Sequence, residues 1–405
     1  MKKVAFLILF VFVLIPLFSF SQKPTRWRGP HQNGYYPETD LLKRWPEGGP
    51  EILWHYDNLG EGYSSPVFAN YRIYISGMEG TTGFIYSLSN DGKMIWKAPY
   101  GKEFSASYPG SRSTPVIIGD FLYILSGQGY LTCLSAISGR IIWNKNILKE
   151  FEGRNIQWGI TETLLIDGNK LICTPGGKQH NMIAVNRVNG ELIWSVKGIG
   201  DKSAYCSPLL VEMAGRNLLV THMADNIVGI DSDDGKLLWN YRHTNRYAVH
   251  PNTPLFHNNQ LFCFSGYGKG GVMLELSTNG STIAEKWFSE TMDSRIGGAV
   301  FMNGFIYGSG DKNREWQCID WDTGRVVYSS KEIGNGVVIA ADGLLYWYSQ
   351  RGELALVKPE TSAFKIVGKT RVSLGSGQHW AHPVINDGKL FVRHGNVLIA
   401  YDIRE

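Results

Sequence analysis

The chain has 405 residues, 47 of them glycine, with 13% aromatic residues, only 19% charged residues and a formal net charge of +4. The basic residues are scattered among acidic ones and form no Lys/Arg block, which excludes the composition typical of nucleic-acid-binding proteins. Frequent glycine and aromatic residues in a long chain favour many short strands joined by tight turns, and no long stretch is biased enough to predict disorder.

The N-terminus has the pattern of a secretory signal peptide. Lys2 and Lys3 precede an apolar run from Val4 to Phe18, and small and polar residues follow up to Gln22. This order predicts cleavage after Ser21 and a soluble protein exported to the periplasm or the exterior. An uncleaved anchor is the alternative, but the run is shorter than the roughly 20 residues that span a bilayer. No later apolar segment reaches that length, so we expect no integral membrane segment after cleavage.

Residues 22–50 form a lead-in with two segments rich in Gly and Pro, Trp27-Arg28-Gly29-Pro30 and Trp45 to Pro50. Such residues interrupt regular structure, so we expect no long helix or strand there. Residues 51–56 are then expected to form a strand. With its Trp54, this strand looks like the last strand of a repeat whose earlier strands are missing.

A hairpin pattern recurs through residues 51–405. A polar residue and Gly stand between two apolar runs, which is a strong hairpin signal, and the Gly takes a turn position with positive φ. In five copies the Gly stands four residues before an aromatic residue. These pairs are Gly92 and Trp96, Gly139 and Trp143, Gly190 and Trp194, Gly235 and Trp239, and Gly324 and Tyr328.

The spacing of these hairpins predicts the architecture. Aromatic residues that close a repeat stand at positions 54, 96, 143, 194, 239, 287 and 328, so successive repeats are 41 to 51 residues long. Four short strands in such a period are typical of propeller blades. We predict that residues 51–405 are one all-β domain, an eight-bladed β-propeller of four-stranded antiparallel blades, with seven blades as the alternative. The last repeat has only three strands, and residues 51–56 supply the fourth, which closes the ring and removes exposed sheet edges.

The cysteines are odd in number and cannot all pair within the chain. Their places within strands of separate repeats predict buried thiols that act as small apolar residues. They are Cys133, Cys173, Cys206, Cys263 and Cys318.

One run of the repeat resembles a known family. Gly229 to Trp239 is similar to the tryptophan-docking repeat of quinoprotein propellers, Ala-x-Asp-x-x-x-Gly-x-x-x-Trp, and residues 184–194 and 318–328 follow the same pattern. The likeness covers nearly the whole mature chain. Trp27-Arg28-Gly29-Pro30 also resembles the opening of secreted bacterial PQQ-like β-propeller repeat proteins. Their relatives include pyrroloquinoline-quinone dehydrogenases and the assembly factor BamB. The resemblance implies the fold and leaves the function open, because one fold serves enzymes, scaffolds and sensors.

The candidate site is the mouth of the central channel, where the residues just before each blade's first strand should converge. Aromatic faces there stack on rings, and cationic side chains bind acidic groups. We therefore predict a ligand-binding site for something anionic or sugar-like; the alternative is that the aromatic residues pack between blades and that arginine bonds backbone carbonyls. The predicted residues are Tyr63, Tyr108, Arg112, Trp158, Tyr205, His250, Arg295, Gln378, His379, Trp380 and His382.

Loops between the second and third strands of the blades should share this face and add positive charge to it. Carboxylates are sparse among the candidate residues, and Glu79, Glu162 and Asp311 are the main acids expected nearby. The expected cationic residues of these loops are Lys178, His180, Lys269, Lys312, Arg314 and Arg351.

The sequence contains no recognisable catalytic set. His379 and His382 enter a strand on opposite faces, and zinc usually needs three or more protein ligands, so we predict no metal site. The chain has no Gly-x-Ser-x-Gly motif, and it lacks the adjacent Cys-Cys that the resemblance to quinone enzymes would imply. We therefore expect a non-catalytic, monomeric propeller, without cofactor or nucleic acid, that binds a partner protein, glycan or other ligand. The resemblance leaves two alternatives, a dehydrogenase-like oxidoreductase using PQQ and Ca²⁺ at a divergent site, and a BamB-like scaffold in outer-membrane protein assembly.

Overall fold

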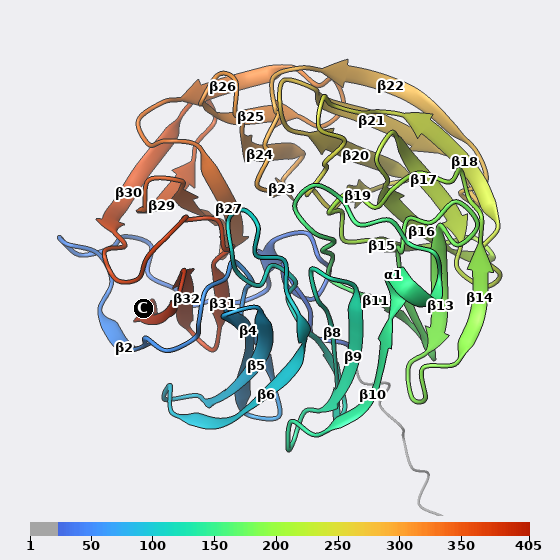
Figure 1. The fold of residues 1–405 in the computed structure, drawn as a ribbon. Helices are drawn as coiled ribbons and strands as arrows, with labels where there is room; N and C mark the ends of the chain where they lie inside the picture. Colours follow the sequence, from blue (N-terminus) through green and yellow to red (C-terminus); the bar gives the residue numbers. More distant parts are fainter. Residues whose placement is uncertain (1–22) are drawn as a thin grey trace, which may run out of the picture.

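Eight four-stranded antiparallel units surround a central channel (Figure 1). The structure, a computed structural model, describes residues 23–405, and the predicted signal peptide lies outside this range. The prediction of an all-β, eight-bladed propeller is confirmed, and the seven-bladed alternative is wrong. Within the described residues, no helix has the length and apolar character needed to cross a membrane.

Blades 1 to 4 follow one another along the chain, each running from the channel to the rim. Blade 1 comprises β3 (Val67–Ala69), β4 (Arg72–Glu79), β5 (Thr82–Ser89) and β6 (Met94–Lys102). Blade 2 comprises β7 (Val116–Ile118), β8 (Phe121–Leu125), β9 (Tyr130–Ser135) and β10 (Ile141–Asn146), and the short helix α1 (Ile147–Glu150) follows it. Blade 3 comprises β11 (Leu165–Asp167), β12 (Lys170–Cys173), β13 (Met182–Asn186) and β14 (Leu192–Val196). Blade 4 comprises β15 (Leu209–Met213), β16 (Arg216–His222), β17 (Asn226–Asp231) and β18 (Leu237–Arg242).

Blades 5 to 8 complete the ring. Blade 5 comprises β19 (Leu255–His257), β20 (Gln260–Ser265), β21 (Gly270–Leu276) and β22 (Ile283–Ser289). Blade 6 comprises β23 (Ala299–Met302), β24 (Phe305–Ser309), β25 (Trp316–Asp320) and β26 (Val326–Ser330). Blade 7 comprises β27 (Gly336–Ala341), β28 (Leu344–Ser349), β29 (Glu353–Pro359) and β30 (Phe364–Arg371). Blade 8 comprises β31 (Val384–Asn386), β32 (Lys389–His394), β33 (Val397–Asp402) and, at the rim, β2 (Ile52–Tyr56).

Blade 8 joins the two ends of the chain. Strand β2 pairs antiparallel with β33, placing Trp54 opposite Ala400 and Tyr56 opposite Leu398. The predicted closure of the ring by an N-terminal strand is therefore confirmed. It leaves no blade with a missing rim strand and no open end to the ring.

The recurring Trp and Gly join neighbouring blades. In five blades the indole Nε1–H of the closing Trp donates to a carbonyl of the next blade, over 3.0 to 3.1 Å, and the turn Gly of that next blade commonly lies against the Trp ring. Their repetition in five blades indicates that these residues are structural. The donors are Trp54, Trp143, Trp194, Trp239 and Trp287.

Gly235 offers a direct test of this contact. Its φ is +76°, and a Cβ there would lie 2.5 Å from Cγ1 of Val196 and 2.9 Å from Cε3 of Trp194. Replacing Gly235 with alanine should lower the free energy of unfolding by about 2–3 kcal/mol, because backbone strain and a steric clash add together. Urea denaturation would measure this. The matched control is Gly215→Ala, at φ +81° with no atom within 4 Å, which should lose only about 1 kcal/mol. Equal losses would contradict the contact.

All five cysteines are buried and free, in agreement with the predicted unpaired thiols. Their pKa values also fit this role, since burial raises the pKa of Cys206 to about 11 and that of Cys133 to about 12. We therefore assign them to packing.

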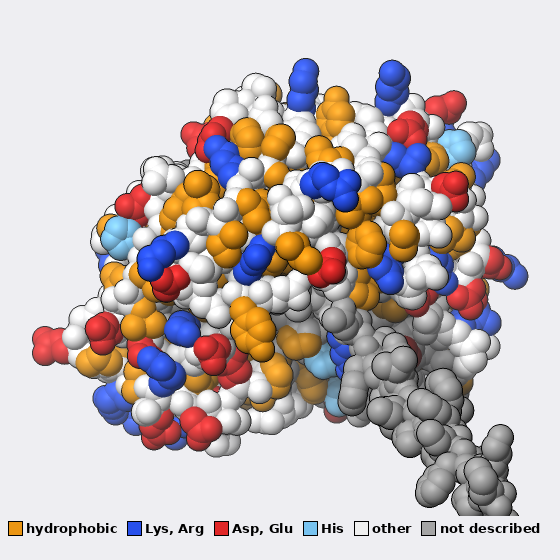
Figure 2. All heavy atoms as spheres, turned by 90° about the horizontal axis from the view of Figure 1, so that it is seen from below, with side chains coloured by type: hydrophobic (Ala, Val, Ile, Leu, Met, Phe, Trp, Pro, Cys, Tyr) orange, Lys and Arg blue, Asp and Glu red, His pale blue; other side chains and the backbone are white. Residues whose placement is uncertain are grey.

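The rim of the propeller carries mixed charge. Figure 2, which views the molecule from below Figure 1, shows Lys and Arg side chains interspersed with Asp and Glu, and scattered apolar side chains between them. Among the exposed apolar residues are Met94, Ile95, Ile141 and Ile142, at the start of the rim strands of blades 1 and 2. No block of one charge stands out on this face, as the sequence composition predicts.

The lead-in crosses the central channel. Thr25 exchanges two backbone hydrogen bonds of 2.9 and 3.0 Å with Ile117 in β7, and β1 (Tyr35–Tyr36) pairs in parallel with the end of β27. Between these points Arg28 donates to the carbonyl of Ala299 in β23. Because β7, β23 and β27 are inner strands of blades 2, 6 and 7, residues 25–36 run from one side of the channel to the other, where Figure 1 shows them in blue.

Candidate functional site

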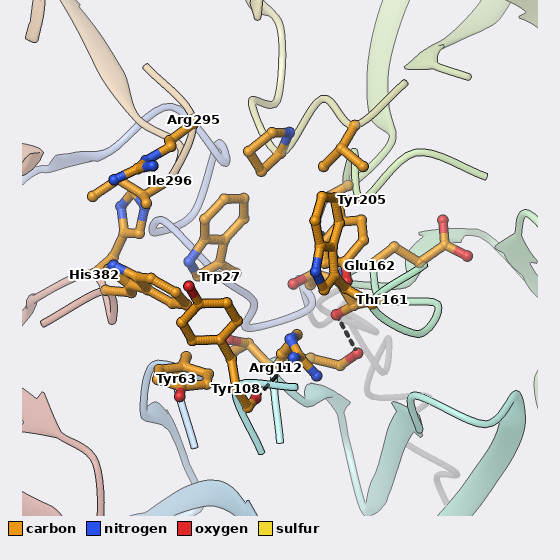
Figure 3. A pocket seen from close by; sticks show the side chains of 18 of the residues that line it. Trp27, Tyr63, Tyr108, Arg112, Thr161, Glu162, Tyr205, Arg295, Ile296 and His382 are labelled. Carbon is orange, nitrogen blue, oxygen red and sulfur yellow. Dashed lines mark hydrogen bonds between the residues drawn. The ribbon is translucent and has the colours of Figure 1, made fainter. Parts of the chain in front are cut away.

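A cavity of about 460 Å³ lies where the connections between blades enter the inner strands (Figure 3). We call it the channel cavity. Seven of the eight connections between blades contribute side chains, the exception being the connection from β26 to β27. Trp27 of the lead-in also lines it, so the segment that crosses the channel forms part of the cavity wall. Convergence of these loops follows from the fold, because every inner strand starts at the same end of the ring.

Nine of the predicted residues line the channel cavity. They are Tyr63, Tyr108, Arg112, Trp158, Tyr205, Arg295, Gln378, Trp380 and His382. The structure therefore brings together residues that are up to 319 positions apart in the chain, counting from Tyr63 to His382.

His250 and His379 do not line the cavity. His250 is buried, stacks on His222 with ring centroids 3.9 Å apart and contacts the Ser265 hydroxyl at 2.6 Å. His379 stacks on His394 with centroids 3.7 Å apart. Both residues stand beside residues that do face the cavity, and successive side chains of an extended segment point to opposite sides. The sequence placed the loops correctly but could not fix which neighbour turns inward.

The loops between second and third strands contribute less than predicted. None of the six cationic residues expected from them lines the channel cavity, and only Tyr267 reaches it from such a loop. Of the three expected acids, Glu162 lines the cavity, whereas Glu79 is bound to Lys97 and Asp311 lies 3.0 Å from Arg295. These loops start one strand farther from the channel, and Lys269, for example, lies over the ring of Phe288 instead.

Three aromatic residues of the site were missed as site residues. Trp27 was noticed because the Trp-Arg-Gly-Pro segment resembles the opening of related propeller proteins. Nothing in the sequence, however, places that segment inside the channel. Tyr247 and Tyr267 lie in irregular loops of the blade 4 to blade 5 region, without a fixed position relative to the repeat. Small hydroxyl residues of three successive connections were also missed; they are Ser113, Thr114, Thr161, Thr163 and Ser207.

Six of the eight Tyr and Trp residues that line the cavity form two groups. The rings of Tyr63 and Tyr108 both lie against the ring of Trp380, and each has its centroid 5.1 Å from that of Trp380. On another part of the wall Tyr247 lies 5.6 Å from Trp158 and 4.6 Å from Tyr267. Figure 3 shows Tyr63 and Tyr108 on one side of the cavity and Tyr205 on the other, with Trp27 between them. This arrangement leaves room for a flat ring between aromatic side chains.

Three of the cavity tyrosines have a strained backbone. Tyr108, Tyr205 and Tyr267 adopt φ values of +46°, +73° and +61°. The left-handed region is uncommon for bulky residues and costs about 1–3 kcal/mol each. Such strain is concentrated at functional sites, so its presence at three residues of one cavity favours a binding role over simple packing.

Arg28 and His382 connect the lead-in to the cavity wall. Arg28 donates to Nδ1 of His382 over 3.2 Å, so this nitrogen is unprotonated, and burial holds the pKa of His382 well below its usual range. The ring of Trp27 meets that of His382 edge-on, with centroids 4.9 Å apart. Three polar atoms of the wall are buried without a hydrogen-bond partner within residues 23–405, namely the Tyr205 hydroxyl, Trp380 Nε1 and His382 Nε2.

Glu162 is the carboxylate of the wall. Its oxygens accept hydrogen bonds from the backbone N–H and the hydroxyl of Thr174, over 2.8 and 3.0 Å. Burial raises the pKa of Glu162 to about 7, although both of these bonds oppose the shift. Near neutral pH the group is therefore partly protonated, and its hydrogen bonds hold it against the blade 3 backbone.

This pKa predicts a pH dependence of stability. An unfolded Glu loses its proton near pH 4.5, so between about pH 4.5 and 7 the folded state binds more protons and stability falls as the pH rises. From pH 5 to 8 the group should lower the free energy of unfolding by about 2–3 kcal/mol. Glu162→Gln, which mimics the protonated acid, should remove this part of the slope in urea titrations. Glu103, also buried with a pKa raised to about 7, remains in both proteins and contributes equally. Parallel curves for the two proteins would contradict the assignment.

Comparison with known proteins identifies the family. A family profile described as "Outer membrane protein assembly factor BamB" matches residues 81–330, which is more than half of the chain. The chain belongs to this family of PQQ-like β-propellers. The resemblance inferred from the docking repeat is thereby confirmed.

Individual relatives of this family are distant. The outer membrane protein assembly factor BamB of Kangiella koreensis is 23% identical over 225 residues, which cover 53% of this chain and 52% of that protein. An uncharacterised protein of Rickettsia conorii is 21% identical over 251 residues, covering 50% of this chain and 59% of that protein. The chain thus spans between half and three fifths of the length of these relatives.

Solved structures agree on the fold alone. BamB from Moraxella catarrhalis superimposes with a TM-score of 0.62 at 13% identity, covering 88% of this chain and 98% of the other. A quinohemoprotein alcohol dehydrogenase from Comamonas testosteroni gives a TM-score of 0.64 at 12% identity, covering 94% and 80%. BamB and an alcohol dehydrogenase are therefore about equally similar to this chain in shape, and the function has to be argued from the site.

Proposed function

We propose that the protein is an exported, non-catalytic binding protein that holds a small ring-bearing molecule in the channel cavity. The observation that carries this proposal is the cavity of about 460 Å³ with aromatic groups on its walls. Binding pockets combine apolar walls with a few polar groups, and the volume lies within their usual range. The expected monomeric state and the absence of nucleic-acid binding remain predictions.

Exposure of the aromatic residues supports ligand binding against packing between blades. Tyr108 is 51% exposed and Tyr247 is 38% exposed. Tyrosines that served only to pack blades together would be buried like Tyr74 and Tyr123, which are fully buried. A ring-shaped ligand would cover this exposed aromatic surface and gain the free energy of its burial.

The donor set of the site does not fit the calcium-bound quinone of the dehydrogenases. Ca²⁺ takes six to eight oxygen ligands, usually including several carboxylates. Within residues 23–405, no group of three or more His, Cys, Asp or Glu side chains is placed to hold a metal ion, and the one carboxylate of the cavity wall is bound to Thr174. We therefore derive no redox step for this protein.

Native mass spectrometry of the protein purified from its own cell envelope would test the proposal. A bound small molecule should appear with the wild-type protein and be lost in Trp380→Ala, which removes the centre of one aromatic group. The control is Tyr71→Ala, because Tyr71 is 93% exposed and lies outside the cavity. A bound species that persists in Trp380→Ala, or none in any preparation, would contradict binding in the cavity.

The family match favours a second candidate, a role in outer-membrane protein assembly, which is the role named for the relative from Kangiella koreensis. The matched residues 81–330 include blades 2 to 6 entire, so any partner surface shared with that relative should lie there. Crosslinking in intact cells followed by purification would test it. Recovery of the assembly machinery of the outer membrane would support this role, and its repeated absence under conditions that recover known components would exclude it.

A further inference from the structure

The charged side chains of the channel cavity do not contribute equally to its field. Arg112, Glu162 and Arg295 line it. Arg295 lies 3.0 Å from the carboxylate of Asp311 and also bonds Gln350, so its charge is largely balanced. The carboxyl of Glu162 is turned to Thr174, and its raised pKa reduces its negative charge near neutral pH.

Arg112 is the cation of the cavity that has no acidic partner. Its guanidinium donates to the carbonyls of Ser107 and Tyr108, over 3.1 and 2.8 Å, and more weakly to that of Gly110. Among the described residues it makes no ion pair, and the carboxyl on which it acts at longer range is that of buried Glu103, whose pKa Arg112 lowers against the larger opposite effect of burial. The carbonyls hold the guanidinium in place without an ion pair, which suits an anion-binding residue.

The position of Arg112 relates this charge to the aromatic groups. Its side chain bonds the backbone of Tyr108, which itself contacts Trp380. Figure 3 shows Arg112 beside Tyr108 and facing the space near Thr161, below the ring of Trp27. A ring lying on the Trp380 group would therefore bring an attached acidic group close to the guanidinium.

We infer that the ligand is a six-membered ring that carries a single carboxylate, with the ring against the Trp380 group and the carboxylate on Arg112. This inference rests on the proposed function and specifies its ligand. One unpaired cation matches one carboxylate, and a second or third would meet no free positive charge in the cavity. A uronic acid and an aromatic carboxylate share this chemistry.

Isothermal titration with matched pairs of probes tests the inference. Glucuronate is compared with glucose, and 4-hydroxybenzoate with 4-hydroxybenzyl alcohol. At least one acid should bind about tenfold or more tightly than its neutral partner, since a hydrogen bond between a guanidinium and a carboxylate is stronger than one to a neutral group. Whichever acid binds identifies the kind of ring.

Two arginine variants provide the matched controls. Arg112→Gln should abolish the preference for the acid, and Arg112→Lys should keep part of it because the charge remains. Arg295→Gln should keep the preference, because Arg295 lines the same cavity but is balanced by Asp311. Circular dichroism and urea denaturation establish that each variant is folded before it is titrated.

Three results would overturn the inference. Equal binding of acid and neutral partner, with both weakened in Trp380→Ala, would leave the proposed function intact and remove the acidic ligand. Equal loss of acid preference in the Arg112 and Arg295 variants would show a general charge effect in place of a specific contact. Failure of all four probes to bind overturns the ligand class, while the native mass spectrometry described above decides the proposed function separately.

Discussion

Replacing Arg393 with methionine is expected to lower the free energy of unfolding by about 3–5 kcal/mol, because several buried acceptors lose their donor at once. Arg393 is fully buried in β32 of blade 8 and reaches into blade 1. Its guanidinium donates to the Ser64 hydroxyl over 2.6 Å and to the Ser76 carbonyl over 2.5 Å, and its Nε donates to the Gly395 carbonyl over 2.8 Å. The side chain thus joins the last blade to the first.

Chemical denaturation followed by fluorescence would measure this loss. Arg351→Met is the control, because Arg351 is exposed in a loop of blade 7 and should change stability by less than about 0.5 kcal/mol. If Arg393→Met proved as stable as the control, the joint between blades 8 and 1 would depend on apolar packing and the β2 strand alone.

Replacing Arg28 with methionine should release the lead-in from the channel and lower the free energy of unfolding by about 2–4 kcal/mol. Arg28 is 2% exposed, and burial without an acidic partner lowers its pKa to about 10. It donates to the carbonyls of Asn33 and Ala299 and to Nδ1 of His382. Methionine fills similar space but leaves these acceptors unpaired.

Hydrogen exchange of the backbone amides of Thr25 and Ile117 is the most direct readout. These amides are bonded to each other's carbonyls, so their exchange should become faster in the variant if the lead-in leaves the channel. Arg44→Met, which changes an exposed arginine of the same lead-in, should leave exchange unchanged. Slow exchange at Thr25 in Arg28→Met would show that strand pairing alone holds the segment.

These two arginines illustrate what the sequence could not supply. Both carry buried charges that bond backbone carbonyls rather than acids. A carbonyl is present at every residue, so no pairing pattern in the sequence marks where such an arginine inserts. Arg28 was noticed only as part of the Trp-Arg-Gly-Pro segment, and its place in the channel depends on the packing of blades 6 and 8 around it.

The candidate site shows a similar division. The position of each connection between blades followed from the repeat, and this alone gathered Tyr63, Arg112, Trp380 and other residues at one end of the channel. Which residue of a connection faces the cavity depends on its φ and ψ angles, as in the strained turn at Tyr205. For this reason His250 and His379, each beside a cavity residue, turn away into the spaces between strands.

The sequence by itself determined the architecture, because a repeat of 41 to 51 residues, with the same Gly-to-aromatic spacing in five copies, predicts a similar hairpin in each repeat. Ring closure by residues 51–56 followed from the same count of strands. One end of the chain has an unpaired strand and the other has a three-stranded blade, and pairing the two completes the eighth blade. Only the tertiary structure decided that the lead-in crosses the channel. It also decided that the charge of Arg295 is balanced by an ion pair with Asp311, whereas Arg112 makes no ion pair. Those features depend on contacts between distant, non-repeating segments, for which local patterns carry no information.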